Sequence, residues 1–472
     1  MQVDGLLSLP NELLLHIFAH FDDPYPLFPL SSLCRRLHFI ALPLYLERTG
    51  VYEALSPALS NISIRAEQTG VLAALQTALF LGKAHNLTCT FIHPQSRFSD
   101  IARYRRLVSI LDGVRVATLV FDPSTFDEYS EGLRWRYGLD VVHALNTVLE
   151  KSCTELTFGT PNAVPGSRVS RRHRINGNAR SVKQPQSSAS LSPGALHKRL
   201  LTGLHLHSEI PFCPQLRTWT TAVLHSFPLS TLSIWMPNAE TELLGTIFSE
   251  IEIPTLCRLT VRQTRLKPAS LHSFLGRHPQ LTHLHLEKLF VPSPQERLPP
   301  TALQSLVSLI AEPIHTAYLL HVLDPLPSSF ASIRILGHLT TVDVQAADAA
   351  LHHVRSRIAQ LARITLTLPV PDMHGLPTAA PDTGLCFEEA ESALYFVSHL
   401  EFTFGDCTTP IPLFKLLDYV AKWSAAFPLL RVVELGQLGN QEKYSEEDVV
   451  LGLRKCLEVE TLVLNGRAFS RD

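Results

Sequence analysis

The sequence predicts an α/β protein in which a short all-helical N-terminal motif precedes a long array of parallel strands backed by helices. Three observations predict this fold class. Apolar residues recur at helical spacing between Leu9 and Tyr45. From residue 60 onward, a short strand pattern with apolar residues at its first, fourth and sixth positions repeats along the chain. Amphipathic segments lie between the copies, and strands that alternate with helices are typical of parallel sheets.

The N-terminal motif is predicted to contain two main helices. Pro10 suits the first turn of a helix, where its missing N–H costs nothing, and Glu12 lies near the positive helix end. The first helix has one apolar face, formed by Leu13, Leu14, Ile17, Phe18 and Phe21. After Asp22-Asp23-Pro24, the second helix carries Leu27, Leu30, Leu33, Cys34 and Leu37 on one side. So small a motif buries little surface, and its apolar residues therefore need a partner, either the rest of the chain or another protein.

The strand pattern recurs at intervals of mostly about 22 to 37 residues, the range of solenoid repeats. The clear copies are Leu229–Ile234, Leu256–Val261, Leu281–Leu286, Leu339–Val344, Leu361–Leu366, Leu430–Leu435 and Val459–Leu464. Weaker copies are Ser60–Ile64, Asn86–Phe91, Val116–Phe121, Cys153–Phe158, Leu201–Leu206, Ile314–Leu319 and Val397–Phe402. Helices are predicted between them, for example over Leu243–Ile251, Leu303–Ile310 and Phe414–Trp423.

Residues 159–200 interrupt the repeats. Between Thr160 and Arg199 the chain is rich in Pro, Gly, Ser, Asn and Gln, and it carries eight Lys and Arg residues and no acidic residue. This composition predicts a disordered basic insertion. Its Arg171–Arg174 stretch is either a nuclear-import or nucleic-acid patch or a solvated loop. The predicted domains are therefore a helical motif over residues 1–48 and a repeat array over 49–472, with 159–200 inserted.

Charge and cysteine usage favour an intracellular protein. The formal net charge is −2 and the pI is about 6.9, which demands neither nucleic acid nor an anionic membrane as a partner. The eight cysteines lie far apart and include no C-x-x-C pair, which indicates reduced thiols rather than disulfides or zinc. We see no secretory signal and no apolar run long enough to span a membrane. We therefore expect a soluble protein that is cytoplasmic, nuclear or both.

No enzyme motif is found. The sequence has no P-loop, no G-x-G-x-x-G and no G-x-S-x-G. His283 and His285 are two residues apart on a predicted strand and so share a face, as metal ligands would, but no third ligand is near in sequence. Histidines on a binding face are the alternative interpretation. We expect no catalytic residue, no metal and no cofactor.

The N-terminal pattern resembles an F-box. It reads Leu9-Pro10-x-Glu12-Leu13, then Ile17, Asp22-Asp23, Leu27 and Leu33-Cys34-Arg35-Arg36-Leu37, with Leu37 standing where the family usually carries Trp. The resemblance implies docking onto a Skp-family adaptor, and through it onto a cullin. The adaptor-binding residues that it implies are Leu9, Pro10, Leu13, Ile17, Leu27, Leu30, Cys34 and Leu37. The later repeats resemble an irregular leucine-rich-repeat solenoid, the alternative being an ordinary layered α/β domain.

Together the two resemblances imply a substrate-recognition subunit of an SCF-type E3 ubiquitin ligase, which does not itself catalyse ubiquitin transfer. The alternative is a repeat-based interaction scaffold whose N-terminal helices only cap the solenoid. The two hypotheses differ in one structural respect. A receptor exposes the apolar face of Leu13, Ile17, Leu27 and Leu30, whereas a cap buries this face against the first repeats.

The target protein is expected on the concave strand face. Side chains alternate along a strand, so positions 3, 5 and 7 of the pattern point away from the apolar positions. This register predicts a target-binding set of Trp235, Arg258, Arg262, His283 and His285. An exposed Trp beside arginines is typical of an interface hot spot, and the arginines favour an acidic or phosphorylated segment. Farther along, Asp343, Glu401 and Glu434 are expected to make the row acidic. The alternative is that these are solvated strand residues with no partner.

Overall fold

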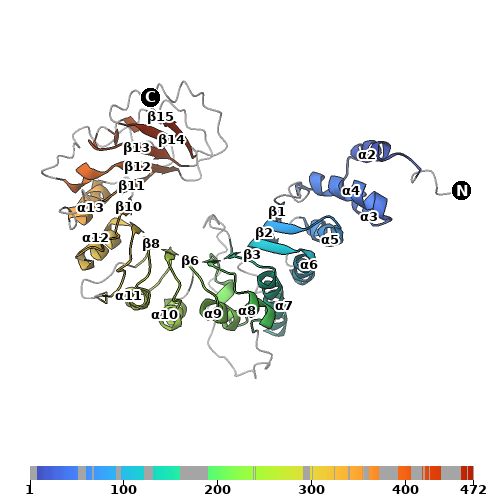
Figure 1. Ribbon diagram of the computed structural model, residues 1–472, viewed down its shortest axis with the longest axis horizontal. Coiled ribbons are helices and arrows are strands. Elements are labelled where there is room, and N and C mark those ends of the chain that lie inside the picture. Colours follow the sequence, from blue (N-terminus) through green and yellow to red (C-terminus); the bar gives the residue numbers. More distant parts are fainter. Residues whose placement is uncertain are drawn as a thin grey trace. The chain divides into compact units, whose positions relative to one another are not determined.

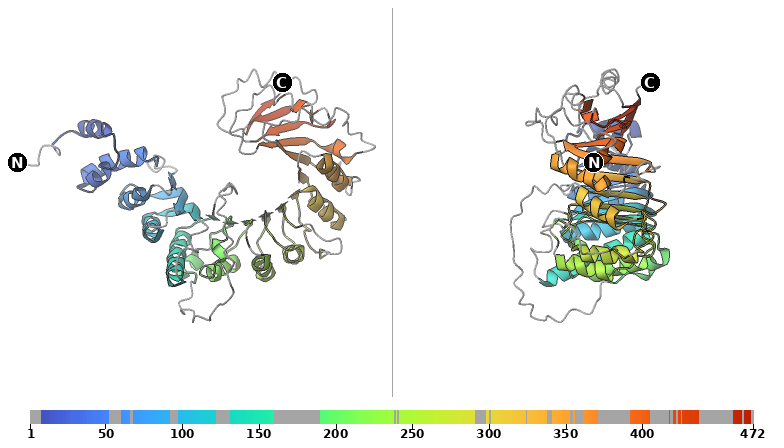
Figure 2. Two further views of the ribbon diagram at one scale, coloured as in Figure 1. Left: turned by 180° about the vertical axis from the view of Figure 1, so that it is seen from behind. Right: turned by 90° about the vertical axis from the view of Figure 1, so that its left-hand side faces the viewer.

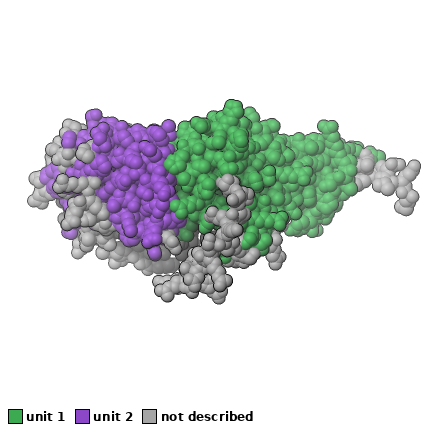
Figure 3. All heavy atoms as spheres, turned by 90° about the horizontal axis from the view of Figure 1, so that it is seen from below, with its two compact units in different colours: residues 1–236 green, residues 237–472 purple. Residues whose placement is uncertain are grey.

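The fold is taken from a computed structural model of the chain. It describes residues 8–51, 60–65, 68–91, 97–121, 131–159, 190–237, 239, 241–290, 298–299, 301–323, 325–337, 341–352, 355, 361–370, 392–404, 417, 420–421, 423–424, 426–436, 459–464 and 466–470. The chain forms two compact units, Met1–Met236 (unit 1) and Pro237–Asp472 (unit 2) (Figure 3).

Unit 1 begins with three helices, α2 (Asn11–Ala19), α3 (Leu27–Ser31) and α4 (Arg35–Arg48). Strands and helices then follow one another as β1 (Ser60–Ile64), α5 (Thr69–Thr77), β2 (Lys83–Phe91), α6 (Arg97–Ile110), β3 (Gly113–Phe121), α7 (Glu131–Glu150), β4 (Glu155–Phe158), α8 (Pro193–Lys198), β5 (Gly203–Leu206), the 3-10 helix η3 (Ile210–Phe212), α9 (Arg217–Ser226) and β6 (Thr231–Trp235). β1 to β6 pair in chain order and all in parallel. Helices α5 to α9 lie on one side of these strands (Figure 1).

Unit 2 continues the same alternation. Its elements are α10 (Thr241–Glu250), β7 (Arg258–Arg262), α11 (Pro268–Arg277), β8 (His283–Glu287), β9 (Ser308–Ala311), α12 (Pro313–Val322), β10 (Ser332–Leu336), α13 (Thr341–His352), β11 (Arg363–Val370), the 3-10 helix η5 (Ala393–Phe396), β12 (His399–Phe404), β13 (Val432–Leu435), β14 (Thr461–Leu464) and β15 (Arg467–Ser470). β7 to β14 pair in parallel and in chain order. Only the last pair, β14 with β15, is antiparallel among the described strands. Figure 2 shows α10 to α13 on one side of β7 to β10.

The core of each unit lies between its strands and its helices. Along β7, Leu259 and Val261 are buried while Arg258 is exposed, and β8 repeats this alternation. The helices complete the core from the other side: the rings of Phe248 on α10 and Phe274 on α11 meet at 5.0 Å. The predicted α/β class, with helices at the N-terminus and parallel strands after them, is therefore confirmed.

Two predicted strands of unit 2 are wrong. Ile314–Leu319 lies inside α12, and Leu339–Val344 overlaps the start of α13. The strands come earlier, as β9 and β10, and β9 occupies part of the predicted helix Leu303–Ile310. The physical reason at α12 is Pro313, which occupies the first helical turn and ends the preceding strand. At β10, Ile333 and Ile335 alternate with half-exposed residues, which is the pattern of a half-buried strand.

Part of the predicted insertion is also ordered. Residues 160–189 lie outside the described residues, but residues 193–198 form α8. Ser192 caps this helix, because its Oγ accepts a hydrogen bond from the N–H of Ala195 at 3.1 Å. The same Oγ donates to Oε1 of Glu150 on α7 at 2.6 Å. The expectation of disorder is therefore wrong for this end of the insertion.

Candidate functional site

Helix α2 exposes two apolar side chains on one face. Leu14 and Phe18 turn inward and are buried, whereas Leu13 and Ile17 are 49% and 38% exposed. Residues four apart lie one above the other on a helix, so Leu13 and Ile17 form one continuous patch. Exposed apolar side chains at this spacing suit the docking of another protein.

Two arginines of α4 fix the orientation of α2. Near its start, Arg36 donates to the carbonyl of Leu9, and its Nε donates to Oδ1 of Asn11 at 2.8 Å. At its end, Arg48 donates to the carbonyl of Phe21 and to that of Ala19, the latter at 2.5 Å. A cation on the last carbonyls of a helix is favourable because these groups have no partner within the helix. The Leu13–Ile17 patch is therefore held in place before any partner arrives.

The other side of α4 packs against the first strand-and-helix unit. Nε2 of His38 accepts a hydrogen bond from the N–H of Leu79 at 3.2 Å. The rings of His38 and Phe39 lie 6.2 Å and 6.4 Å from that of Phe80. Helix α4 thus covers the end of the strand array, as expected of a cap, while the face of α2 that carries Leu13 and Ile17 stays exposed, as expected of a receptor.

The eight residues predicted to bind an adaptor divide into three groups. Pro10, Leu13 and Ile17 are exposed, Leu9, Leu30 and Cys34 are half-buried, and Leu27 and Leu37 are buried. Leu27 and Leu37 are thus buried in the chain itself, and their contact with an adaptor stays a prediction. Sequence reasoning also missed three exposed apolar side chains of the motif, namely Leu15, Tyr25 and Phe39. Leu33, which was placed on the apolar side of the second helix, is exposed as well. Helical periodicity does not distinguish apolar side chains that pack inside the motif from those that are exposed to another protein.

On the strands of unit 2, the predicted outward register is found. Arg258, Thr260 and Arg262 alternate with the buried residues of β7, as do His283, His285 and Glu287 on β8. Trp235 differs. It belongs to unit 1 and is only 8% exposed, so the expectation of an exposed aromatic side chain at this position is wrong.

The outward row of unit 2 contains two ion pairs between strands. Nε of Arg262 donates to Oε2 of Glu287 at 2.6 Å. Farther along, Arg334 on β10 contacts Glu401 on β12, and its Nε donates to Oγ1 of Thr367 at 3.0 Å. Thr367 in turn donates to Glu401 at 3.1 Å. The predicted acidic row is therefore wrong at Glu401, whose charge is matched by Arg334, and Asp343 belongs to α13 rather than to a strand.

Two histidines of unit 2, His285 and His399, have lowered pKa values and are neutral at neutral pH. Burial lowers the pKa of His285 to about 4, and Arg262 adds to the effect more than Glu287 opposes it. Burial and Arg363 likewise lower the pKa of His399 to about 4. His285 and His399 therefore add no positive charge to the face at neutral pH.

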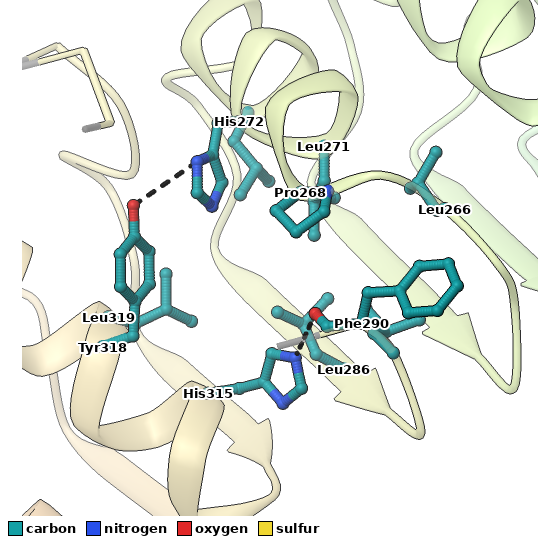
Figure 4. Close-up of a pocket in the computed structure, with 11 residues that line it drawn as sticks. Leu266, Pro268, Leu271, His272, Leu286, Phe290, His315, Tyr318 and Leu319 are labelled. Carbon is teal, nitrogen blue, oxygen red and sulfur yellow. Dashed lines mark hydrogen bonds between the residues drawn. The ribbon is translucent and has the colours of Figure 1, made fainter. Parts of the chain in front are cut away.

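Figure 4 shows a small apolar pocket between α11, β8 and α12. His272 stacks on Tyr318 at 5.1 Å, and Nε2 of His315 lies 3.2 Å from the carbonyl oxygen of Phe290. The cavity volume is about 10 Å³, roughly the space of one water molecule. The pocket is therefore too small for a substrate or a cofactor.

Neither a metal-ligand cluster nor a reactive thiol at Cys153 or Cys213 is found among the described residues. No group of three or more His, Cys, Asp or Glu side chains among them is placed to hold a metal ion. Burial raises the pKa of the Cys153 thiol to about 12 and that of Cys213 to about 11. These thiols therefore stay protonated, whereas a cysteine nucleophile must be a thiolate.

Comparison with known families identifies the helical motif. Residues 6–48 match the family model of F-box-like domains, and these residues include α2, α3 and α4. A search of curated proteins found no match to the chain. Within the described part of the chain, no helix is both long and apolar enough to cross a membrane. The chain thus carries an F-box-like domain at the start of unit 1, and parallel strands follow it in both units.

Proposed function

We propose that this protein is the substrate-recognition subunit of an SCF-type E3 ubiquitin ligase. Helix α2 and its neighbours dock onto a Skp-family adaptor, which links the protein to a cullin in the cytoplasm or nucleus. The observation that carries this proposal is the exposed Leu13–Ile17 patch. It lies on a helix fixed by Arg36 and Arg48, within the residues that match the F-box-like family.

The strand array holds the target in this proposal. Its parallel strands, with helices on one side and outward polar side chains on the other, support an irregular leucine-rich-repeat solenoid. The outward side chains Arg258, Arg262, His283 and His285 are the proposed target contacts. The protein transfers no ubiquitin itself. It keeps the target close to a charged conjugating enzyme, and its contribution is proximity.

The second candidate function is an interaction scaffold whose helical motif only caps the array. The contacts of His38 and Phe39 with Leu79 and Phe80 favour it, because α4 does cover the first strand-and-helix unit. A cap alone gives no reason for α2 to present Leu13 and Ile17 to solvent. The two candidates therefore differ in whether this patch has a partner.

The test is adaptor binding by the double variant Leu13→Asp/Ile17→Asp. A carboxylate at each position would be buried in the contact at a cost of several kcal/mol, enough to abolish micromolar binding. Co-purification of the variant with a Skp-family adaptor should fail, while circular dichroism shows that the variant remains folded.

Leu15→Asp is the matched control. Leu15 is 43% exposed on the same helix but lies about 200° around its axis from Leu13. This variant should bind the adaptor as the wild type does. A folded double variant that still binds with wild-type affinity would show that the motif is only a cap.

A further inference from the structure

The outward side chains of β7 to β11 form a basic face. Its five cations are Arg258, Arg262, Arg334 and Arg363 on the strands and Lys288, which directly follows β8. Two carboxylates lie among them. Glu287 pairs with Arg262 and lies 3.8 Å from Nζ of Lys288, and Glu401 reaches Arg334 from β12. Five cations and two carboxylates leave an excess of three positive charges, and Glu434 on β13 then marks the end of this face.

The two paired arginines keep donors free. Arg262 uses only Nε toward Glu287, and its two terminal nitrogens make no hydrogen bond within the described residues. Arg334 uses Nε and Nη2, so its Nη1 likewise makes no hydrogen bond within the described residues. Their side chains are 38% and 37% exposed. The carboxylates fix both guanidinium groups, so little side-chain entropy remains to be lost when an anion binds.

The two guanidinium groups come from strands on either side of His285. His285 on β8 lies opposite Ile310 on β9, which lies opposite Arg334 on β10. Arg262 and Arg334 both act on the imidazole of His285 and help burial to lower its pKa. Around this histidine, the charges of Arg262 and Arg334 exceed that of Glu287 by one. Arg258 and Arg363 add one exposed positive charge on either side.

We propose that this basic face binds an acidic, unphosphorylated segment of a partner protein, which crosses β7 to β11 with its carboxylates on the arginines. Arg258, the surroundings of His285 and Arg363 each have an excess of about one positive charge, which matches a run of single carboxylates. A phosphate carries nearly two negative charges and would face Glu287 and Glu401 on the basic face. The four strand spacings of about 4.8 Å span roughly 19 Å, which about six extended residues cover. The proposal rests on the proposed function only in taking the partner to be the target.

The experiment uses fluorescence anisotropy of a labelled peptide of about six glutamates with the full-length protein. We expect saturable binding that weakens as salt is raised, and no binding of the matching glutamine peptide. Arg258→Ala/Arg363→Ala removes two exposed arginines that have no ion pair within the described residues, and it should weaken binding at least tenfold. Arg65→Ala/Arg115→Ala removes two exposed arginines of unit 1 and should leave binding unchanged.

Three outcomes would overturn the proposal. They are equal binding of the glutamine peptide, wild-type binding by Arg258→Ala/Arg363→Ala, and tighter binding of a neutral peptide that carries one phosphoserine, which would indicate a phosphate site. Adaptor binding separates this proposal from the function of the F-box-like domain. Leu13→Asp/Ile17→Asp should bind the glutamate peptide normally, and Arg258→Ala/Arg363→Ala should bind the adaptor normally.

Discussion

The outward strand rows of the two units share a backbone geometry but differ in chemistry. In unit 1, one in-register row consists of small polar and imidazole side chains: Ser63, Thr88, Thr118, Thr157, His205 and Ser233. In unit 2, the rows contain Arg262 paired with Glu287 and Arg334 paired with Glu401. Parallel pairing places the side chains in the same way in both units. Residue type alone therefore decides what each row can bind.

The difference also affects what holds neighbouring strands together. In the row of unit 1, Oγ of Ser233 on β6 lies 3.1 Å from Nε2 of His207, which follows β5. This is a neutral hydrogen bond, weaker than one that involves a charged group. In unit 2, Arg262 bridges β7 and β8, and Arg334, Thr367 and Glu401 bridge β10, β11 and β12. The basic face is thus both a binding surface and a set of links between strands.

The largest expected effect comes from removing Glu401. This residue is 9% exposed, and its loss leaves Arg334 and Thr367 without their acceptor. Glu401→Ala should lower the free energy of unfolding by about 2 kcal/mol, a value reduced because Arg334 is partly solvated. Urea unfolding followed by circular dichroism measures the change.

Glu434→Ala is the matched control for this prediction. Glu434 lies directly opposite Glu401 on β13 and makes no hydrogen bond or ion pair within the described residues. We expect a change below about 0.5 kcal/mol. Equal losses of unfolding free energy for Glu401→Ala and Glu434→Ala would mean that the ion pair between Arg334 and Glu401 does not stabilise unit 2.

The sequence predicted part of this difference between the outward rows of the two units. The alternation of Leu259 and Val261 with Arg258 and Arg262 predicted which side chains turn outward, because the period of a strand fixes the faces. The pair Arg334–Glu401 was missed for two reasons. The strand was predicted at Leu339–Val344, whereas β10 lies earlier in the chain. The contact also joins β10 to β12 across β11, so it depends on the register of three strands.

The helical motif shows a second limit of sequence reasoning. Leu13, Ile17, Leu27 and Leu37 all have the apolar spacing of a helix, yet only Leu13 and Ile17 are exposed. Spacing predicts that a side chain meets apolar neighbours, but it does not say whether they belong to the same motif or to a partner. No pattern in the sequence predicted that Arg36 and Arg48 donate hydrogen bonds to backbone carbonyls near the two ends of α2.

A smaller effect on the free energy of unfolding is expected when the pH is lowered. Burial and Arg262 lower the pKa of His285 from its ordinary 6.5 to about 4, so the unfolded chain takes up a proton first as the pH falls. The contribution of neutral His285 to stability is complete above pH 6.5 and is lost as the pH falls toward 4. His285→Gln should therefore reduce the acid-induced fall in unfolding free energy by on the order of 1–2 kcal/mol.

The corresponding variant in unit 1 is His205→Gln. Burial lowers the pKa of His205 as well, but the charge of Glu155 opposes the shift and no arginine adds to it. Urea unfolding at neutral and acidic pH should show a smaller change for His205→Gln than for His285→Gln. The reverse order would mean that the arginines of unit 2 do not control its titration.

The smallest effect compares one pair from each unit by double-mutant cycles. Asn86 donates through Nδ2 to Oδ1 of Asn61 at 2.8 Å and joins β1 to β2, as Arg262 joins β7 to β8 through Glu287. Alanine substitution of both partners should give coupling energies of about 0.5–1 kcal/mol for each pair. Salt distinguishes them. Raising it to roughly 1 M shortens the Debye length to about 3 Å, so the coupling of Arg262 with Glu287 should shrink while that of Asn61 with Asn86 stays. A salt-independent coupling of Arg262 with Glu287 would show that this pair is held by hydrogen-bond geometry rather than by charge, and it would remove the electrostatic difference between the two pairs.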